Sequence, residues 1–343
     1  MGNGLARALS VGAIICLSAL GFSSGIAVAQ TLVVGNKTAD TLGFIDISSG
    51  EMRAVRATGH GPHEVAISPD GTVAAVVSYG SAKQAGHTIG LFDVQSATPL
   101  KVIDLGKHTK PHGLLWMPDG ERLVITAEGS GSLLLVKAQT GEIQHVIATG
   151  QSGSHMVALS PDARLAYISN LGSNSFTVID LETGKRLTTI KAGLETEGIA
   201  VTPDGREIWV SNRAADTVTL FDADGYEPLA IIETGEMPIR VAISPDGRFA
   251  AVSNARDSTI SVIDTESRTV IQTIPLSSSG QAAALMPVTL LFSPDGTRLY
   301  AALTNVAEIA VIDTATWRQT GHFKAGAGSD GLGWSPLALL AEK

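Results

Sequence analysis

The sequence is poor in cysteine, in aromatic residues and in charge. Cys16 is the only cysteine among 343 residues, aromatic residues make up 5% and charged residues 17%. A single cysteine excludes an intrachain disulfide and any site built from several thiolates. Lys and Arg number 24 against 33 Asp and Glu, and the basic residues form no block. We therefore expect no nucleic-acid partner and no attraction to an anionic membrane surface.

The first 29 residues have the pattern of a secretory signal peptide. Arg7 supplies a positive charge, an apolar run extends from Ala8 to Leu20, and Ala27 to Ala29 ends the segment with small residues. This order predicts cleavage after Ala29 and a periplasmic or secreted protein. Because the apolar run is too short for a comfortable bilayer span, we expect no stable membrane insertion. Cleavage removes Cys16 and one basic residue, so the mature chain has a net charge of 23 minus 33, or −10.

The rest of the chain repeats one turn motif. An apolar run followed by a Ser-Pro-Asp-Gly type turn occurs six times, and a shorter seventh copy follows. The copies are VAISPDG (65–71), LLWMPDG (114–120), VALSPDA (157–163), IAVTPDG (199–205), VAISPDG (241–247), LLFSPDG (290–296) and LGWSP (332–336). Proline at the second position and glycine at the fourth favour a type I turn, so each copy predicts a tight corner between two strands.

A second landmark, an alternating strand that ends in Asp, lies between successive turns, as in TVID and SVID. Four short strands in each repeat of about 42 residues are typical of a β-propeller blade. Seven copies predict an all-β, seven-bladed β-propeller with four antiparallel strands per blade, forming one domain over residues 30–343. Because the mature chain begins with three strands of a blade and ends with one strand near Leu332, we expect the two termini to share the closing blade.

The repeat also resembles a known family. The SPDG corners, the strand ends VSN and ISN and the TVxVID-type strands resemble the YVTN-repeat family of seven-bladed β-propellers. The resemblance implies the fold, whereas propellers as a class include enzymes, binding proteins and scaffolds.

One position of the repeat carries the candidate site. In a propeller, residues that enter the innermost strand surround one mouth of the central channel. The seven copies place His63, His112, His155, Glu197, Ile239, Val288 and Asp330 there. The next position adds Glu64 and Arg240, and His60 and His108 lie slightly upstream. We expect these polar side chains to form a binding site at one mouth of the channel.

Two chemistries remain open for this site. Three imidazoles with a carboxylate can bind a divalent transition metal such as zinc or copper. The candidate ligands are His63, His112, His155, Glu197 and Asp330. Without a metal, the segments GPHEV and KPHGL resemble the strand entries of the lactonase propeller family. That resemblance implies His63 or His112 as general base, Glu64 or Glu197 as its partner, and Arg240 as the cation for a carboxylate or an oxyanion.

The sequence thus predicts an exported propeller that binds a metal ion or a small polar ligand at this mouth. Two alternatives stay open: a lactonase-like hydrolase or lactonising isomerase, and a scaffold that binds a protein partner on a propeller face. We expect a monomer.

Overall fold

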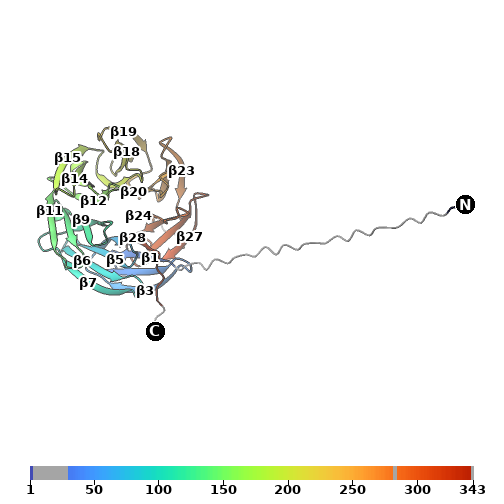
Figure 1. Cartoon of the computed structure of the whole chain (residues 1–343), viewed down its shortest axis with the longest axis horizontal. Coiled ribbons are helices and arrows are strands. Elements are labelled where there is room, and N and C mark those ends of the chain that lie inside the picture. Colours follow the sequence, from blue (N-terminus) through green and yellow to red (C-terminus); the bar gives the residue numbers. More distant parts are fainter. Residues whose placement is uncertain (3–29, 281–283, 341–343) are drawn as a thin grey trace.

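The protein is a seven-bladed β-propeller, in which seven four-stranded antiparallel sheets surround a central axis (Figure 1). The computed structural model describes residues 1–2, 30–280 and 284–340. Nearly all of the predicted signal peptide lies outside these residues. Among the described residues, no helix has the length and apolar character needed to cross a membrane. The predicted fold class is confirmed.

Each blade runs from an innermost strand at the axis to an outermost strand at the rim. The innermost strands are β4 (Pro62–Ile67), β8 (Pro111–Trp116), β12 (Ser154–Leu159), β16 (Thr196–Val201), β20 (Pro238–Ile243), β24 (Pro287–Phe292) and β28 (Ser329–Ser335). The second strands are β5 (Val73–Gly80), β9 (Arg122–Ala127), β13 (Leu165–Asn170), β17 (Glu207–Asn212), β21 (Phe249–Asn254), β25 (Arg298–Leu303) and β1 (Thr31–Asn36).

The third strands are β6 (Ala85–Asp93), β10 (Ser132–Lys137), β14 (Ser175–Asp180), β18 (Thr217–Asp222), β22 (Thr259–Asp264), β26 (Glu308–Asp313) and β2 (Thr41–Asp46). The outermost strands are β7 (Thr98–Asp104), β11 (Ile143–Ala148), β15 (Lys185–Lys191), β19 (Pro228–Glu233), β23 (Thr269–Pro275), β27 (Arg318–Lys324) and β3 (Glu51–Ala57). Two short 3-10 helices follow second strands, η1 (Glu128–Ser130) and η2 (Leu171–Ser173).

The predicted corners join the first and second strands of the blades. In the first copy, the Ser68 hydroxyl donates to Asp70 at 2.6 Å and accepts from the Val73 amide at 2.9 Å. Gly71 has φ +80°, a conformation in which a side chain would be strained. The repeated motif therefore encodes both the turn and the start of the next strand.

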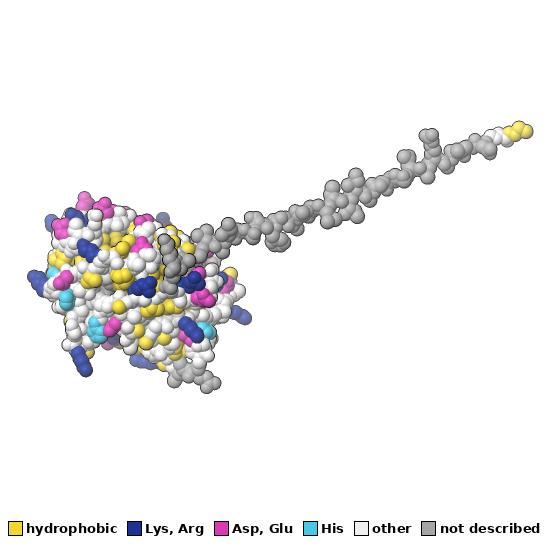
Figure 2. All heavy atoms as spheres, turned by 90° about the horizontal axis from the view of Figure 1, so that it is seen from below, with side chains coloured by type: hydrophobic (Ala, Val, Ile, Leu, Met, Phe, Trp, Pro, Cys, Tyr) yellow, Lys and Arg dark blue, Asp and Glu magenta, His cyan; other side chains and the backbone are white. Residues whose placement is uncertain are grey.

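The closing blade joins the two ends of the chain, as predicted. β28 pairs antiparallel with β1, with Leu32 opposite Trp334, and the sheet continues through β2 and β3. Apolar side chains fill the space between neighbouring blades, where Trp209 and Phe44 are fully buried. The face seen in Figure 2 carries both acidic and basic side chains, interspersed with hydrophobic ones.

A β-bulge at the same place in all seven innermost strands shapes the channel mouth. In β4, Pro62 lies opposite Ser78 and Val65 opposite Val76, so two residues of β4 face one residue of β5. The same shift occurs in every other blade. In a regular strand, successive side chains point to opposite faces of the sheet, and a bulge of this kind interrupts that alternation. Two consecutive residues of each inner strand can therefore reach the channel, and the predicted site residues occupy these positions.

Candidate functional site at the channel mouth

Five side chains from successive blades form a continuous arc around the channel. Asp330 lies 2.9 Å from Nδ1 of His63, and the ring centroids of His63 and His112 are 4.7 Å apart. The rings of His112 and His155 follow at 3.7 Å, and Nε2 of His155 lies 3.5 Å from Glu197. All but His63 are less than 9% exposed. The imidazoles therefore converge as the sequence predicted, within a buried cluster.

An ion pair crosses the channel beside this arc. Nη2 of Arg240 lies 2.6 Å from Glu64, and both residues are buried. Their strands, β20 and β4, are separated by two blades on one side and three on the other, so the pair bridges the channel. Nη1 of Arg240 also lies 3.6 Å from Glu197. Arg240 thus connects the arc to the opposite side of the mouth.

Sequence reasoning missed four polar residues of the cluster. Each follows the residue of the second strand that pairs with the first residue of the inner strand. Lys37 lies 3.2 Å from Asp330, and Arg213 lies 3.0 Å from Glu197. The Tyr79 hydroxyl donates to one Glu128 oxygen at 2.6 Å, and the other oxygen contacts Nδ1 of His155. The sequence did carry a signal, because this position follows the residue that ends VSN and ISN in other blades.

The electrostatics give the histidines different protonation states. Burial, together with the nearby His155 and His63, lowers the pKa of His112, so His112 is neutral at pH 7. Burial also opposes protonation of His155, but hydrogen bonds to Glu128 and Glu197 outweigh it and raise its pKa. The three imidazoles, predicted to be neutral ligands, are therefore not equivalent.

The carboxylates of the cluster are held ionised. Burial alone would raise the pKa of Asp330, but His63, Lys37 and Arg240 hold it far below its ordinary value. Burial opposes ionisation of Glu197 and Glu128 too, yet His155 lowers the pKa of both. Four carboxylates, Glu64, Glu128, Glu197 and Asp330, face the cations Lys37, Arg213 and Arg240. They also face the imidazole of His155, whose raised pKa favours its protonated form.

Three buried polar atoms of the cluster have neither a hydrogen bond nor an ion pair within the described part of the chain. They are Nε of Arg240, Nδ1 of His112 and Oδ1 of Asp330. A buried polar atom without a partner is costly, so such atoms indicate a bound water or ligand. The charge of Arg240 contributes to lowering the pKa of both His112 and Asp330, so the three groups interact electrostatically.

His60 and His108 lie outside the cluster, which corrects the expectation that five histidines meet at the mouth. His60 is about half exposed and contacts Asp40 at 2.8 Å. Nδ1 of His108 lies 3.0 Å from the Ser130 hydroxyl. Just before each inner strand, one residue has a positive φ, and in these two blades it is Gly61 and Lys110. The turn at this residue separates the upstream histidines from those of the inner strands.

The imidazoles stack on one another instead of aiming their nitrogens at a common point. Two imidazoles bound to one ion at about 2.0–2.1 Å per bond hold their rings farther apart than the 3.7 Å between His112 and His155. In the described residues, no group of three or more His, Cys, Asp or Glu is placed to hold a metal ion. A zinc or copper site stays a prediction from the sequence.

The remaining two blades make the mouth apolar. Ile239 of β20 and Val288 of β24 occupy the positions that hold the histidines in other blades. They form a buried cluster with Ala255, against which Met237 and Met286 pack. Ile239 and Val288 make this part of the mouth apolar, whereas Arg240, which follows Ile239 on β20, extends from the same blade to the charged cluster.

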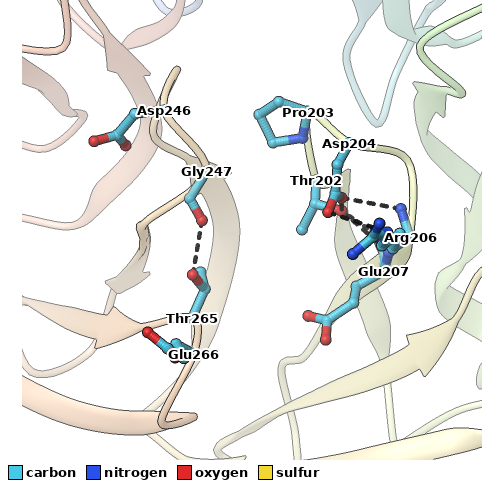
Figure 3. A pocket seen from close by; sticks show the side chains of 9 residues that line it. All are labelled: Thr202, Pro203, Asp204, Arg206, Glu207, Asp246, Gly247, Thr265 and Glu266. Carbon is cyan, nitrogen blue, oxygen red and sulfur yellow. Dashed lines mark hydrogen bonds and ion pairs between the residues drawn. The ribbon is translucent and has the colours of Figure 1, made fainter.

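A hollow outside the channel, of about 600 Å³, lies between the turns of the β16 and β20 blades (Figure 3). Three of its acidic groups, Asp204, Glu207 and Asp246, have partners. Asp204 accepts from Thr202 at 2.6 Å, and Glu207 pairs with Arg268 at 2.7 Å. This hollow is a surface crevice between turns and not a competing site.

The fold and the axial cluster define a seven-bladed propeller with a polar site at one channel mouth. The chain belongs to the cytochrome D1 heme domain family, whose model matches residues 119–332. The predicted resemblance is thus confirmed at the level of a seven-bladed propeller, and the YVTN-repeat name stays a prediction.

Solved structures of similar fold support the architecture. Hydrazine synthase of Kuenenia stuttgartiensis matches with a TM-score of 0.72 and 20% identity, over 83% of this chain and 92% of that chain. Dihydro-heme d1 dehydrogenase NirN in complex with DHE matches with a TM-score of 0.66 and 16% identity, over 89% of this chain and 75% of that chain. At these identities the likeness shows the fold alone. A comparison with curated proteins finds no match.

Proposed function

We propose that this propeller binds a small ligand bearing both a hydroxyl and a carbonyl or carboxylate oxygen at the channel mouth. The observation that carries the proposal is the set of unpartnered atoms on Arg240, His112 and Asp330. Arg240 donates to a ligand oxygen through Nε, and Asp330 accepts from a ligand hydroxyl. Neutral His112 offers either a donor or an acceptor, according to its tautomer.

Calorimetric titration with 4-hydroxybutanoate tests this proposal. We expect binding to wild type and at least about tenfold weaker binding to His112→Asn and to Asp330→Asn, because hydrogen bonds to charged or buried groups contribute about 1.5–3 kcal/mol. His60→Asn is the matched control, since His60 lies outside the cluster. Equal affinities in all four proteins would contradict the proposal.

The neutral state of His112 favours a second candidate, hydrolysis of a lactone. A neutral imidazole can take a proton from water, and Arg240 can stabilise the oxyanion that forms as the water oxygen adds to the carbonyl carbon. Because the pKa of His112 is lowered, activity would persist below pH 6.5 and fall only when His112 becomes protonated. Turnover of γ-butyrolactone across pH 4–8, in wild type and His112→Asn, tests this candidate.

The family name raises the question of a heme, and the cluster does not fit one. A heme needs basic partners for its carboxylates, whereas Lys37, Arg213 and Arg240 already pair with carboxylates of this chain. His112 has a free Nδ1, but its ring packs between the rings of His155 and His63, where a macrocycle would have to lie. We therefore expect titration with hemin to give no stoichiometric Soret band. Such a band, lost in His112→Ala, would contradict this conclusion.

Export completes the proposal. Residues 1–29 act as a signal peptide cut after Ala29, and residues 30–343 form one domain in the periplasm. Sequencing the N-terminus of the mature protein tests this, with Gln30 expected as the first residue.

A further inference from the structure

We infer that the ligand of the channel mouth is amphipathic, with its polar end in the charged arc and an apolar end against the β20 and β24 blades. This inference rests on the proposed function and adds the chemical class of the ligand. The apolar wall consists of Met237, Ile239, Ala255, Met286 and Val288.

Three equivalent positions of each blade face the mouth, and they separate the blades into two groups. The positions are the residue before the inner strand, the second residue of that strand, and the residue that follows the second-strand partner of its first residue. Five blades contribute Gly61, His63 and Tyr79; Lys110, His112 and Glu128; Gly153, His155 and Leu171; Glu195, Glu197 and Arg213; and Gly328, Asp330 and Lys37. The other two contribute Met237, Ile239 and Ala255, and Met286, Val288 and Thr304. These two blades are neighbours, so the apolar wall is continuous.

Backbone geometry shows that the two methionines occupy unfavourable positions. The residue before every inner strand has a positive φ, which is 61° for Met237 and 56° for Met286. Glycine adopts this conformation without strain and occupies the position in three blades, as at Gly61. A methionine in its place introduces strain that a glycine would avoid. Strained residues cluster where a site requires their side chains.

The methionines also lie where a ligand can reach them. Ile239, Ala255 and Val288 are less than 10% exposed and form the back of the wall. Met237 and Met286 are only partly buried and pack on its outer side. Methionine is flexible and polarisable, so it adapts to apolar groups of different shape.

A uniformly polar ligand fits this mouth less well than an amphipathic one, because part of it would lie against the apolar wall. A polyhydroxylated sugar acid would place hydroxyl groups against Ile239 and Val288, whose side chains form no hydrogen bonds, and the hydroxyl of Thr289 next to Val288 could satisfy one of them at most in part. A short hydroxy acid with an alkyl or aryl substituent satisfies Arg240, His112 and Asp330 at one end and leaves its apolar end against Met237 and Met286.

A homologous series tests the inference. Calorimetry would measure binding of 4-hydroxybutanoate, 4-hydroxyhexanoate and 4-hydroxyoctanoate to the mature protein. We expect wild-type affinity to rise by up to about fourfold per added methylene group, the factor that corresponds to about 0.8 kcal/mol per buried methylene. In the double variant Met237→Ala/Met286→Ala, we expect this rise per methylene group to shrink at least by half.

Met52→Ala is the matched control, because Met52 lies on the outermost strand β3, and its slope should equal that of wild type. Binding of all three acids with the same affinity would overturn the inference and leave the proposed function intact. An undiminished rise in the double variant would also overturn it. If none of the three acids binds, both the proposed function and the inference fail.

Discussion

The charged and apolar sides of the channel mouth share one backbone and differ in side chains. Every inner strand has the same bulge, and every residue before it has a positive φ. Yet the β16 blade presents Glu195 and Glu197 where the β20 blade presents Met237 and Ile239. Because the same fold accepts both sets, the architecture alone does not require four buried carboxylates. The two sides differ in the side chains at equivalent positions, and the proposed function assigns this difference to the ligand.

Among the substitutions considered, removal of Arg240 should lower the stability of the protein most. Arg240→Met leaves Glu64 buried without its partner and should lower the free energy of unfolding by about 3–5 kcal/mol. The double variant Glu64→Gln/Arg240→Met should recover part of this loss, because it removes the unpaired charge. Urea denaturation measures both.

A matched exposed pair provides the control. Arg53→Met removes an exposed partner of Glu51 and should change stability by less than about 1 kcal/mol. If Arg240→Met destabilised no more than Arg53→Met, the ion pair across the channel would not be formed as described.

The two histidines should give the charged side opposite pH dependences. His155 has a raised pKa in the folded protein, so the folded state holds the extra proton above pH 6.5, and its contribution to stability is lost as pH rises through that pKa. His112 has a lowered pKa, so the unfolded state binds the proton first, and stability falls as pH drops below 6.5.

Denaturation at several pH values in His155→Asn and His112→Asn checks these signs. Each variant should lose the corresponding part of the wild-type pH dependence. Val288→Ala, on the apolar side, should lower stability by the same amount at every pH. A pH-dependent effect of Val288→Ala would contradict the prediction that only the charged side makes stability depend on pH.

We expect the smallest change in stability at Met237, a residue of the apolar side whose backbone is strained. Met237→Gly removes the backbone strain of a non-glycine residue at positive φ, but it also removes apolar contacts. The net change in unfolding free energy should therefore stay within about 1 kcal/mol. Glu195→Gly, at the equivalent position on the charged side, also removes the partner of Arg213 at 2.8 Å and should be less stable than Met237→Gly. Thermal unfolding compares the two variants. A larger loss of stability in Met237→Gly than in Glu195→Gly would show that Met237 contributes mainly through packing.

The sequence predicts much of this because the repeat is regular. The SPDG corners locate each inner strand, and counting back from them finds His63, His112, His155, Glu197 and Asp330. The bulge is not visible in the sequence, because it depends on pairing with the second strand. The Arg240 to Glu64 contact was not predicted, since it joins blades that are not neighbours and depends on the width of the channel.

Protonation is the other property that residue order does not reveal. His112 and His155 occupy equivalent positions, yet Glu128 and Glu197 contact only His155 closely enough to raise its pKa. Glu128 lies at the exit from the second strand, whereas the histidines lie at the entry to the first strand, so the repeat position that finds the histidines does not include Glu128. An alignment of the seven second strands on the residue paired with the start of the inner strand identifies Lys37, Tyr79, Glu128 and Arg213 at the next position.

A crystal structure of the mature protein with 4-hydroxybutanoate tests the central claim most directly. The account predicts ligand density in the channel mouth, with oxygens within hydrogen-bond distance of Arg240 Nε, His112 Nδ1 and Asp330 Oδ1. Density at another place, or these three atoms satisfied by protein groups at ligand concentrations that saturate binding, would contradict it.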